Sequence, residues 1–140
     1  MSCGTLKINA LEETFTNQKA SDSLVPRELF CLAYSQQAGF ILQIGGMKTE
    51  SLIGLKAVHR YTLETDRWDY DVPPLNKLRE NGSACAIGTT FYVFCGLKSS
   101  GTAVASVEKL VWDSREETGW QLFTPKGACE RESPAVVVLD

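Results

Sequence analysis

The sequence is poor in the groups from which enzymes and metal sites are built. It contains a single histidine, His59, which we expect on the face of a strand, and it has no Cys-x-x-Cys pair. A zinc or copper centre with clustered imidazole and thiolate ligands is therefore hard to assemble. The Gly-x-Ser-x-Gly and Walker A motifs are absent, and the acidic residues of segment 64–71 lack the pattern of a calcium loop. We predict a protein that is not an enzyme and that binds no cofactor or metal.

Long apolar runs and an excess of positive charge are also missing. No stretch approaches the ~18 apolar residues that cross a bilayer, and residues 1–7 lack the basic segment and apolar run of a secretory signal. Lysine and arginine number 14 against 17 aspartate and glutamate residues, so the net charge is −3 and no basic stripe is present. Nucleic acid and membranes are therefore not expected as partners, and a cytoplasmic location is expected.

Five cysteines are present, an odd number without the spacing of a zinc site. We expect buried, reduced thiols that pack as small hydrophobes, which fits a reducing compartment. Cys85 and Cys95 fall on neighbouring strands of a predicted hairpin and could approach one another. No basic cluster near the cysteines in the sequence favours a reactive thiol. The five are Cys3, Cys31, Cys85, Cys95 and Cys129.

A repeat of 52 residues is the strongest signal in the chain. Arg-Glu dipeptides that begin at Arg27, Arg79 and Arg131 are spaced by 52 residues, and Trp68 and Trp120 have the same spacing. A period near 50 is typical of β-propellers, which are built from similar blades. The repeat predicts a set of equivalent β-sheets and favours a binding surface over an active site.

Each repeat begins with two short apolar segments separated by a turn. Segments 29–34 and 40–44 flank one turn, segments 82–87 and 91–94 flank the next, and both turns contain glycine. The length of these segments and their content of valine, isoleucine and aromatic residues favour strands over helices. We therefore predict a β-hairpin at the start of each repeat.

The second half of the repeat also predicts a hairpin. Segments 58–63 and 107–111 are each followed by a polar turn and then by Trp68 or Trp120, which begins the next strand. The remaining predicted strands, from partial copies at the two ends of the chain, are 6–10, 14–18 and 134–139.

A fixed order of residues separates one arginine from the next. A glycine pair, an aromatic or apolar strand, a charged turn, a tryptophan and proline precede the following arginine. The second copy departs at Cys95, which replaces the first glycine, and at Leu110, which stands where a tyrosine is expected. The best-preserved copy contains Gly45-Gly46, Tyr61, Trp68, Pro73-Pro74 and Arg79.

This order resembles the kelch repeat, and the resemblance covers nearly the whole chain. It implies an all-β, kelch-type β-propeller fragment with about two full four-stranded antiparallel blades and partial blades at both ends. The tryptophans would pack between adjacent blades. The implied divisions are a half blade at 1–24, full blades at 25–76 and 77–128, and the first strand of a further blade at 129–140.

Two blades with partial blades at each end cannot close a propeller, which uses roughly 4–8 blades. Each open blade face would expose on the order of 500 Å² of apolar surface, more than a monomer normally tolerates. We therefore expect the chain either to be a fragment of a longer propeller or to self-associate.

The candidate binding residues follow from the resemblance. In kelch proteins, arginines in the loop that enters the innermost strand often line a peptide-binding mouth, and Arg27, Arg79 and Arg131 occupy the matching positions. A guanidinium can hold a carboxylate at two points. In the alternative interpretation, the repeated glutamates pair with these arginines and join adjacent blades. The polar neighbours Asn81, Ser83 and Ser133 complete the candidate binding set. The repeated glutamates of the alternative interpretation are Glu28, Glu80 and Glu132.

Two functions are consistent with the resemblance. The first is a non-catalytic protein–protein interaction module that binds a cytoskeletal or ubiquitin-ligase-related protein through loops on one propeller face. The second is a fragment of a kelch-fold, carbohydrate-acting enzyme such as a sugar isomerase, whose catalytic residues would lie in blades outside this sequence.

Overall fold

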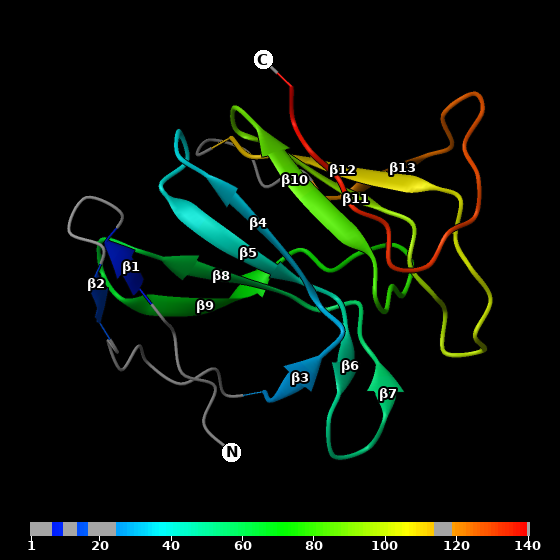
Figure 1. Cartoon of the computed structure of the whole chain (residues 1–140), viewed down its shortest axis with the longest axis horizontal. Helices are drawn as coiled ribbons and strands as arrows, with labels where there is room; N and C mark the ends of the chain where they lie inside the picture. The colour runs from blue at the N-terminus through cyan, green and yellow to red at the C-terminus, as the bar shows by residue number, and fades with distance from the viewer. Residues whose placement is uncertain (1–6, 10–13, 17–24, 114–118, 140) are drawn as a thin grey trace.

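The computed structural model describes residues 7–9, 14–16, 25–113 and 119–139, and in these ranges every helix or strand element is a β-strand (Figure 1). The expected all-β class is confirmed. Most of the strands belong to two four-stranded antiparallel sheets. The strands are β1 (Lys7–Asn9), β2 (Thr14–Thr16), β3 (Arg27–Glu28), β4 (Cys31–Ser35), β5 (Phe40–Ile44), β6 (Met47–Lys48), β7 (Ile53–Gly54), β8 (Val58–Thr62), β9 (Arg67–Val72), β10 (Ser83–Ile87), β11 (Thr90–Phe94), β12 (Val107–Val111) and β13 (Gln121–Phe123).

The two four-stranded sheets follow one another along the chain. The first has the order β4-β5-β8-β9 and the second β10-β11-β12-β13, and every strand is antiparallel to its neighbour. The hairpins predicted in each half of the repeat are therefore present, and in each repeat they join into one sheet. An irregularity between Val58 and Arg60 shifts the register of β8 against β9.

Side chains alternate along β4 between a covered and an uncovered face. Cys31, Ala33 and Ser35 are buried, whereas Leu32 and Tyr34 are 56% and 51% exposed. Successive side chains of a strand point to opposite faces of its sheet. One face of the first sheet is therefore buried in the molecule, and the opposite face presents apolar side chains to solvent at β4.

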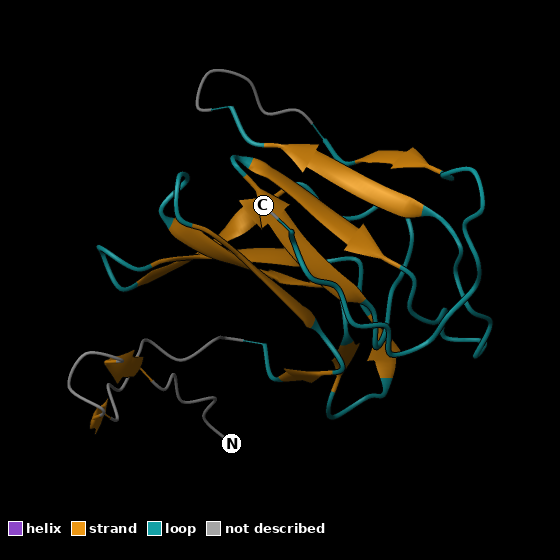
Figure 2. Cartoon of the chain, turned by 45° about the horizontal axis from the view of Figure 1, so that its top comes forward, coloured by secondary structure: helices purple, strands orange, loops and turns teal. Residues whose placement is uncertain are grey.

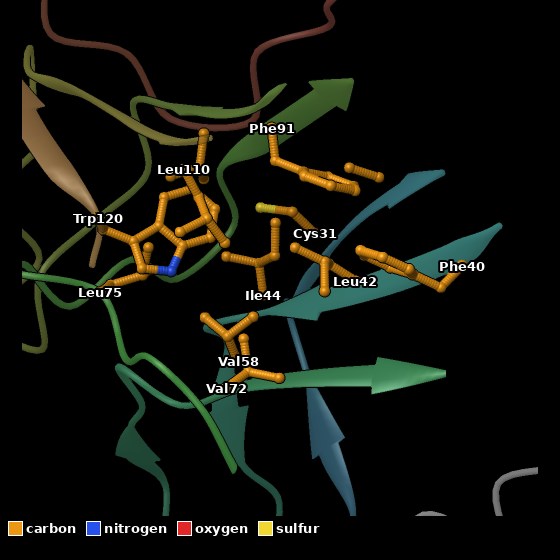
Figure 3. Close-up of a cluster of buried hydrophobic side chains, with 12 residues drawn as sticks. Cys31, Phe40, Leu42, Ile44, Val58, Val72, Leu75, Phe91, Leu110 and Trp120 are labelled. Atoms are coloured by element: carbon orange, nitrogen blue, oxygen red, sulfur yellow. The ribbon is translucent and has the colours of Figure 1, made fainter. Parts of the chain in front are cut away.

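The hydrophobic core lies between the two sheets, and side chains from both of them meet there (Figure 3). Strand β4 lies beside β10 (Figure 1). Phe40 stacks on Phe91 with ring centroids 5.3 Å apart, and Trp112 meets Phe40 edge-on at 4.8 Å. Burial of apolar area between the sheets is the main force that holds them together. The buried cluster is Cys31, Ala33, Phe40, Leu42, Ile44, Val58, Val72, Leu75, Phe91, Val93, Leu110 and Trp120.

The two tryptophans spaced by 52 residues have different surroundings. Trp120 is 6% exposed, and its Nε1 donates a hydrogen bond to the carbonyl of Pro73 at 2.9 Å. It thus joins the second sheet to the end of the first. Trp68 is half-buried and packs on the ring of Tyr61, with centroids 5.1 Å apart. Of these two tryptophans, only Trp120 is therefore a buried member of the core between the two sheets.

The remaining strands lie outside the two sheets. Strands β1 and β2 pair as a hairpin, as predicted, and β3 pairs with β6 of the β6–β7 hairpin. Segment 134–139, predicted as a strand, forms none, because no described strand pairs with its backbone. Figure 2 shows strands and loops without a helix in the described part of the chain, so no described helix could cross a membrane.

Candidate functional site

Three residues spaced by 52 positions form a row at one end of the two sheets. The backbone N–H of Asn81 donates to the carbonyl of Leu29 at 2.8 Å, and the N–H of Ser133 donates to the carbonyl of Asn81 at 2.9 Å. All three have positive φ, at 55° for Leu29, 55° for Asn81 and 47° for Ser133. Positive φ is uncommon outside glycine. The 52-residue repeat of the sequence is therefore a repeat of backbone conformation as well.

Two glycines extend this correspondence. Gly46 donates its N–H to the carbonyl of Arg79 at 2.9 Å, and Gly96 donates to the carbonyl of Arg131 at 3.1 Å. Their φ angles are 88° and 87°, and an added Cβ would lie 2.6 Å or 2.8 Å from a backbone carbonyl oxygen. A side chain would meet that oxygen, so only glycine allows the close approach. Each glycine thus fixes the position of the arginine in the next repeat.

The side chain of Arg79 is fully buried and bonded to its own sheet. Its Nε donates to Glu108 Oε1 at 3.1 Å, and its Nη1 donates to the carbonyls of Cys95 and Ser106, each at 2.8 Å. Burial lowers the pKa of Arg79, and the charge of Glu108 opposes that effect. The guanidinium therefore joins the end of β11 to the start of β12.

Glu108, the partner of Arg79, is also fully buried. Its carboxylate accepts hydrogen bonds from the backbone N–H of Asn76 at 2.6 Å, from Asn76 Nδ2 at 3.0 Å and from the N–H of Lys77 at 3.1 Å. Asn76 and Lys77 belong to the connection between the two sheets. These bonds offset the desolvation of the carboxylate, so one ion pair holds both the second sheet and its connection to the first.

Arg27 makes a matching set of contacts in the first sheet. Its Nη1 donates to the carbonyls of Gly45 and Ala57, each at 3.1 Å, and its Nη2 lies 2.9 Å from the imidazole nitrogens of His59. Burial, and then the charge of Arg27, lower the pKa of His59 to about 4. The imidazole is therefore neutral and can accept a bond from the guanidinium. Burial also lowers the pKa of Arg27 to about 10, an effect that Tyr70 partly opposes.

The two buried arginines have matching backbone partners but different side-chain partners, and Arg79 Nη2 also donates to the Ser106 hydroxyl at 3.1 Å. Each binds a carbonyl after the second strand of its sheet, a carbonyl before the third strand, and the second side chain of that third strand. That side chain is the neutral His59 in the first sheet and the charged Glu108 in the second. The two positions are 49 residues apart, because the turn between the first two strands is two residues shorter in the second repeat and the loop before the third strand is one residue shorter. A comparison at a period of 52 therefore does not detect this pair.

The third arginine of the series has a different setting. Arg131 is exposed, and its Nε donates to Cys129 Sγ at 3.0 Å. Its carbonyl accepts the bond from Gly96, and its backbone bridges to Val104. Arg131 thus keeps the backbone bond of Arg79 while its guanidinium faces the outside.

Burial divides the six predicted binding residues into three pairs. Arg27 and Arg79 are turned into their sheets, whereas Arg131 and Ser133 are exposed. Asn81 and Ser83 are half-buried, and Asn81 donates from its side-chain amide to the hydroxyl of Ser133. The structure brings Asn81 and Ser133 together, and it gives the two buried arginines internal hydrogen-bond partners instead of a free face.

The repeated glutamates do not act as the predicted partners of the arginines. In the part of the chain that the structure describes, the two ion pairs are Arg60–Asp69 and Arg79–Glu108. Glu80 accepts a hydrogen bond from the hydroxyl of Ser99 at 3.3 Å. Arg79 is thus joined to its own sheet by Glu108, a glutamate that lies outside the Arg-Glu repeat.

The opposite end of the sheets carries an open hollow of about 560 Å³ between the β4–β5 and β10–β11 turns. Its lining offers hydrogen-bonding groups without a carboxylate or an imidazole, and no cluster of three metal-ligating side chains occurs among the described residues. The lining residues are Tyr34, Ser35, Gln36, Gln37, Ala86 and Gly88.

No protein-family model matches the chain, and no curated protein matches its sequence.

Proposed function

We propose that the chain forms blades of a kelch-type β-propeller and acts as a non-catalytic protein–protein interaction module. The observation that supports this best is the row of Leu29, Asn81 and Ser133, in which equivalent residues share one conformation and bind one another in series. In a propeller, radial repetition brings equivalent loops together around one mouth. A row of this kind is the arrangement expected where successive blades enter their first strands.

The contact between the two sheets is consistent with this proposal. Cys31 and Ala33 of β4 are buried in the core, and Ala84 and Ala86 of β10 pack against it. In the 52-residue repeat, Leu32 is equivalent to Ala84. The face of β10 that packs on the first sheet is therefore equivalent to the exposed face of β4. Opposite faces of equivalent sheets thus meet. Such head-to-tail packing can continue from one sheet to the next, whereas packing of like faces would end with a pair.

The proposed binding surface is formed by the accessible members of the predicted set. Asn81, Ser83 and Ser133 supply hydrogen-bonding groups, and Arg131 supplies a positive charge. Arg27 and Arg79 support the loops from within through their bonds to backbone carbonyls. We expect a protein partner that presents a carboxylate and polar backbone groups to this surface. The kelch resemblance favours a cytoplasmic partner of the cytoskeletal or ubiquitin-ligase-related kind.

Affinity capture with immobilised variants tests the surface. The double variant Asn81→Ala with Ser133→Ala removes the side-chain pair, and Gln37→Ala at the opposite end of the sheets is the control. We expect a defined set of proteins, identified by mass spectrometry, to bind the wild type and the control and to be lost from the double variant. Equal capture by all three chains, with equal thermal unfolding, would contradict the proposed surface.

We further propose that copies of this chain associate head to tail. Leu32 and Tyr34 are exposed on β4, although the equivalent Ala84 and Ala86 of β10 pack against the core. On the opposite face of the second sheet, Ile87 is 56% exposed. The uncovered face of the first sheet is thus equivalent to the face of the second sheet that packs between the two sheets. The uncovered face of the second sheet is equivalent to the packed face of the first. Exposed apolar surface of this kind favours association, and a second copy supplies the matching face.

A further inference from the structure

Two cysteines from distant parts of the sequence lie together beside the proposed binding surface. Cys95 follows β11 directly, and its thiol contacts the carbonyl oxygen of Cys129 with a sulfur–oxygen distance of 3.9 Å. The hydrogen bond from Gly96 to the carbonyl of Arg131 holds the two segments side by side. Disulfides join residues whose Cα atoms are about 4.4–6.8 Å apart. The Cys95 sulfur thus lies against the backbone of Cys129, and a disulfide requires in addition that the two Cα atoms meet this range.

The backbone of Cys95 is strained for a residue with a side chain. Its φ is 55°, and Gly45 has the equivalent place in the first repeat with φ at 63°. An added Cβ at Gly45 would lie 2.6 Å from the carbonyl oxygen of Arg79. Left-handed conformations of non-glycine residues are costly and concentrate at functional positions. Glycine would meet the backbone requirement with less strain, so the thiol of Cys95 needs a reason of its own.

The setting of Cys129 supplies that reason. Its side chain is exposed, and Arg131 Nε donates a hydrogen bond to its sulfur at 3.0 Å. Reactive cysteines are found where the sulfur is accessible and a cation lies beside it. Two other described cysteines have the opposite setting. Burial raises the pKa of Cys31 to about 11, against smaller effects of Arg79 and a backbone hydrogen bond, and burial also raises the pKa of Cys85.

We propose that Cys129 is a peroxide-reactive thiol and that Cys95 converts its oxidised form into a disulfide within the chain. The inference is independent of the protein-binding role. The Cys129 thiolate attacks one oxygen of hydrogen peroxide, so that an S–O bond forms, the O–O bond breaks and hydroxide leaves. The sulfur loses two electrons and becomes a sulfenic acid, and the peroxide is reduced. The Cys95 thiolate then attacks that sulfur, the S–S bond forms and the S–O bond breaks. The departing hydroxide takes up the proton that Cys95 has lost and leaves as water.

The disulfide would connect the end of β11 to the segment that carries Arg131 and Ser133. Both residues belong to the proposed binding surface, and their backbone already bonds to Gly96 and Asn81. Oxidation would therefore restrict the movement of this segment against the second sheet. Reduction by a dithiol would restore the free thiols, as expected of a reversible modification in a reducing compartment.

Peptide mapping under non-reducing conditions tests the thiol pair. Trypsin releases Cys129 in peptide 127–131 and Cys95 in peptide 80–98, which also contains Cys85. After treatment with hydrogen peroxide, the Cys85→Ser variant should give the two peptides linked, with the link lost on reduction. In Cys95→Ser, oxidation should stop at a sulfenic acid on Cys129, which dimedone traps. In Cys129→Ser, neither product should form.

The role of the arginine has its own control. Arg131→Gln should slow the dimedone labelling of Cys129 during treatment with hydrogen peroxide several-fold. Arg67→Gln, at an exposed arginine of the first sheet, should leave this labelling rate unchanged. Circular dichroism confirms that each variant is folded. Labelling of Cys129 no faster than that of Cys85 would overturn the reactive role. A link found only between two chains on a non-reducing gel would overturn the role of Cys95.

Discussion

Arg79 and Glu108 form a buried ion pair, with 3.1 Å between Nε and Oε1 and no exposed surface on either side chain. One repeat later, Arg131 has the same backbone bond and an exposed guanidinium. A single sequence motif therefore has two physical settings in this chain. The motif alone does not decide between a role inside the sheet and a role on the surface, because the decision depends on which strands lie nearby.

Replacement of Arg79 with alanine should destabilise the fold strongly. Removal of the guanidinium leaves the carboxylate of Glu108 buried without its cation, and such a loss costs about 3–5 kcal/mol. Chemical denaturation followed by circular dichroism measures the free energy of unfolding. Arg131→Ala is the matched control, and we expect it to stay within about 0.5 kcal/mol of the wild type. Equal effects of the two substitutions would show that the ion pair does not stabilise the sheet.

The pH dependence of stability should contain a contribution from His59. Its pKa is lowered from 6.5 to about 4 in the folded chain, chiefly by burial and also by Arg27. Between these values the unfolded chain binds a proton that the folded chain does not. The free energy of unfolding should therefore fall as the pH drops from about 6.5 to 4, by roughly 3 kcal/mol, and the contribution should be constant below pH 4.

His59→Gln provides the comparison for this titration, because glutamine can accept a bond from Arg27 but cannot be protonated in this range. His59 is the single histidine of the chain, so the difference between the two stability curves isolates its contribution from that of the carboxylates. A difference that does not change between pH 4 and 6.5 would mean that His59 is not held neutral by its surroundings.

The strands were easier to predict than the contacts that join them. The apolar segments before Gly45 and before Cys95 form the expected hairpins, because strand length, composition and turn glycines are local properties. The apolar segment 134–139 has the same local pattern and forms no strand, since a strand also requires a neighbour. The 52-residue period does not identify His59 and Glu108 as partners of the arginines, because turns and loops of unequal length move them out of that period.

Gly96 should be intolerant of substitution. An added Cβ would lie 2.8 Å from the carbonyl oxygen of Glu80, and its φ of 87° is unfavourable for alanine. Gly101 has a similar φ of 76° with nothing within 4 Å of an added Cβ. We expect Gly101→Ala to cost about 1–2 kcal/mol from conformation alone, and Gly96→Ala to cost at least about 1 kcal/mol more, from the close contact. Thermal unfolding of both variants measures the difference, and equal costs would place the carbonyl further away than the structure does.

Head-to-tail association should depend on the uncovered face of β4. Leu32 and Tyr34 are about half exposed there, and burial of such side chains contributes roughly 1.5–3 kcal/mol each. Sedimentation velocity over a concentration series should therefore give a mass above that of one chain for the wild type, and the mass of one chain for Leu32→Glu combined with Tyr34→Glu. Leu52→Glu is the control, because Leu52 is 66% exposed between β6 and β7, which belong to a different sheet. A wild type that remains a single chain at every concentration and unfolds cooperatively would contradict the proposed association, since the exposed face would then need no partner.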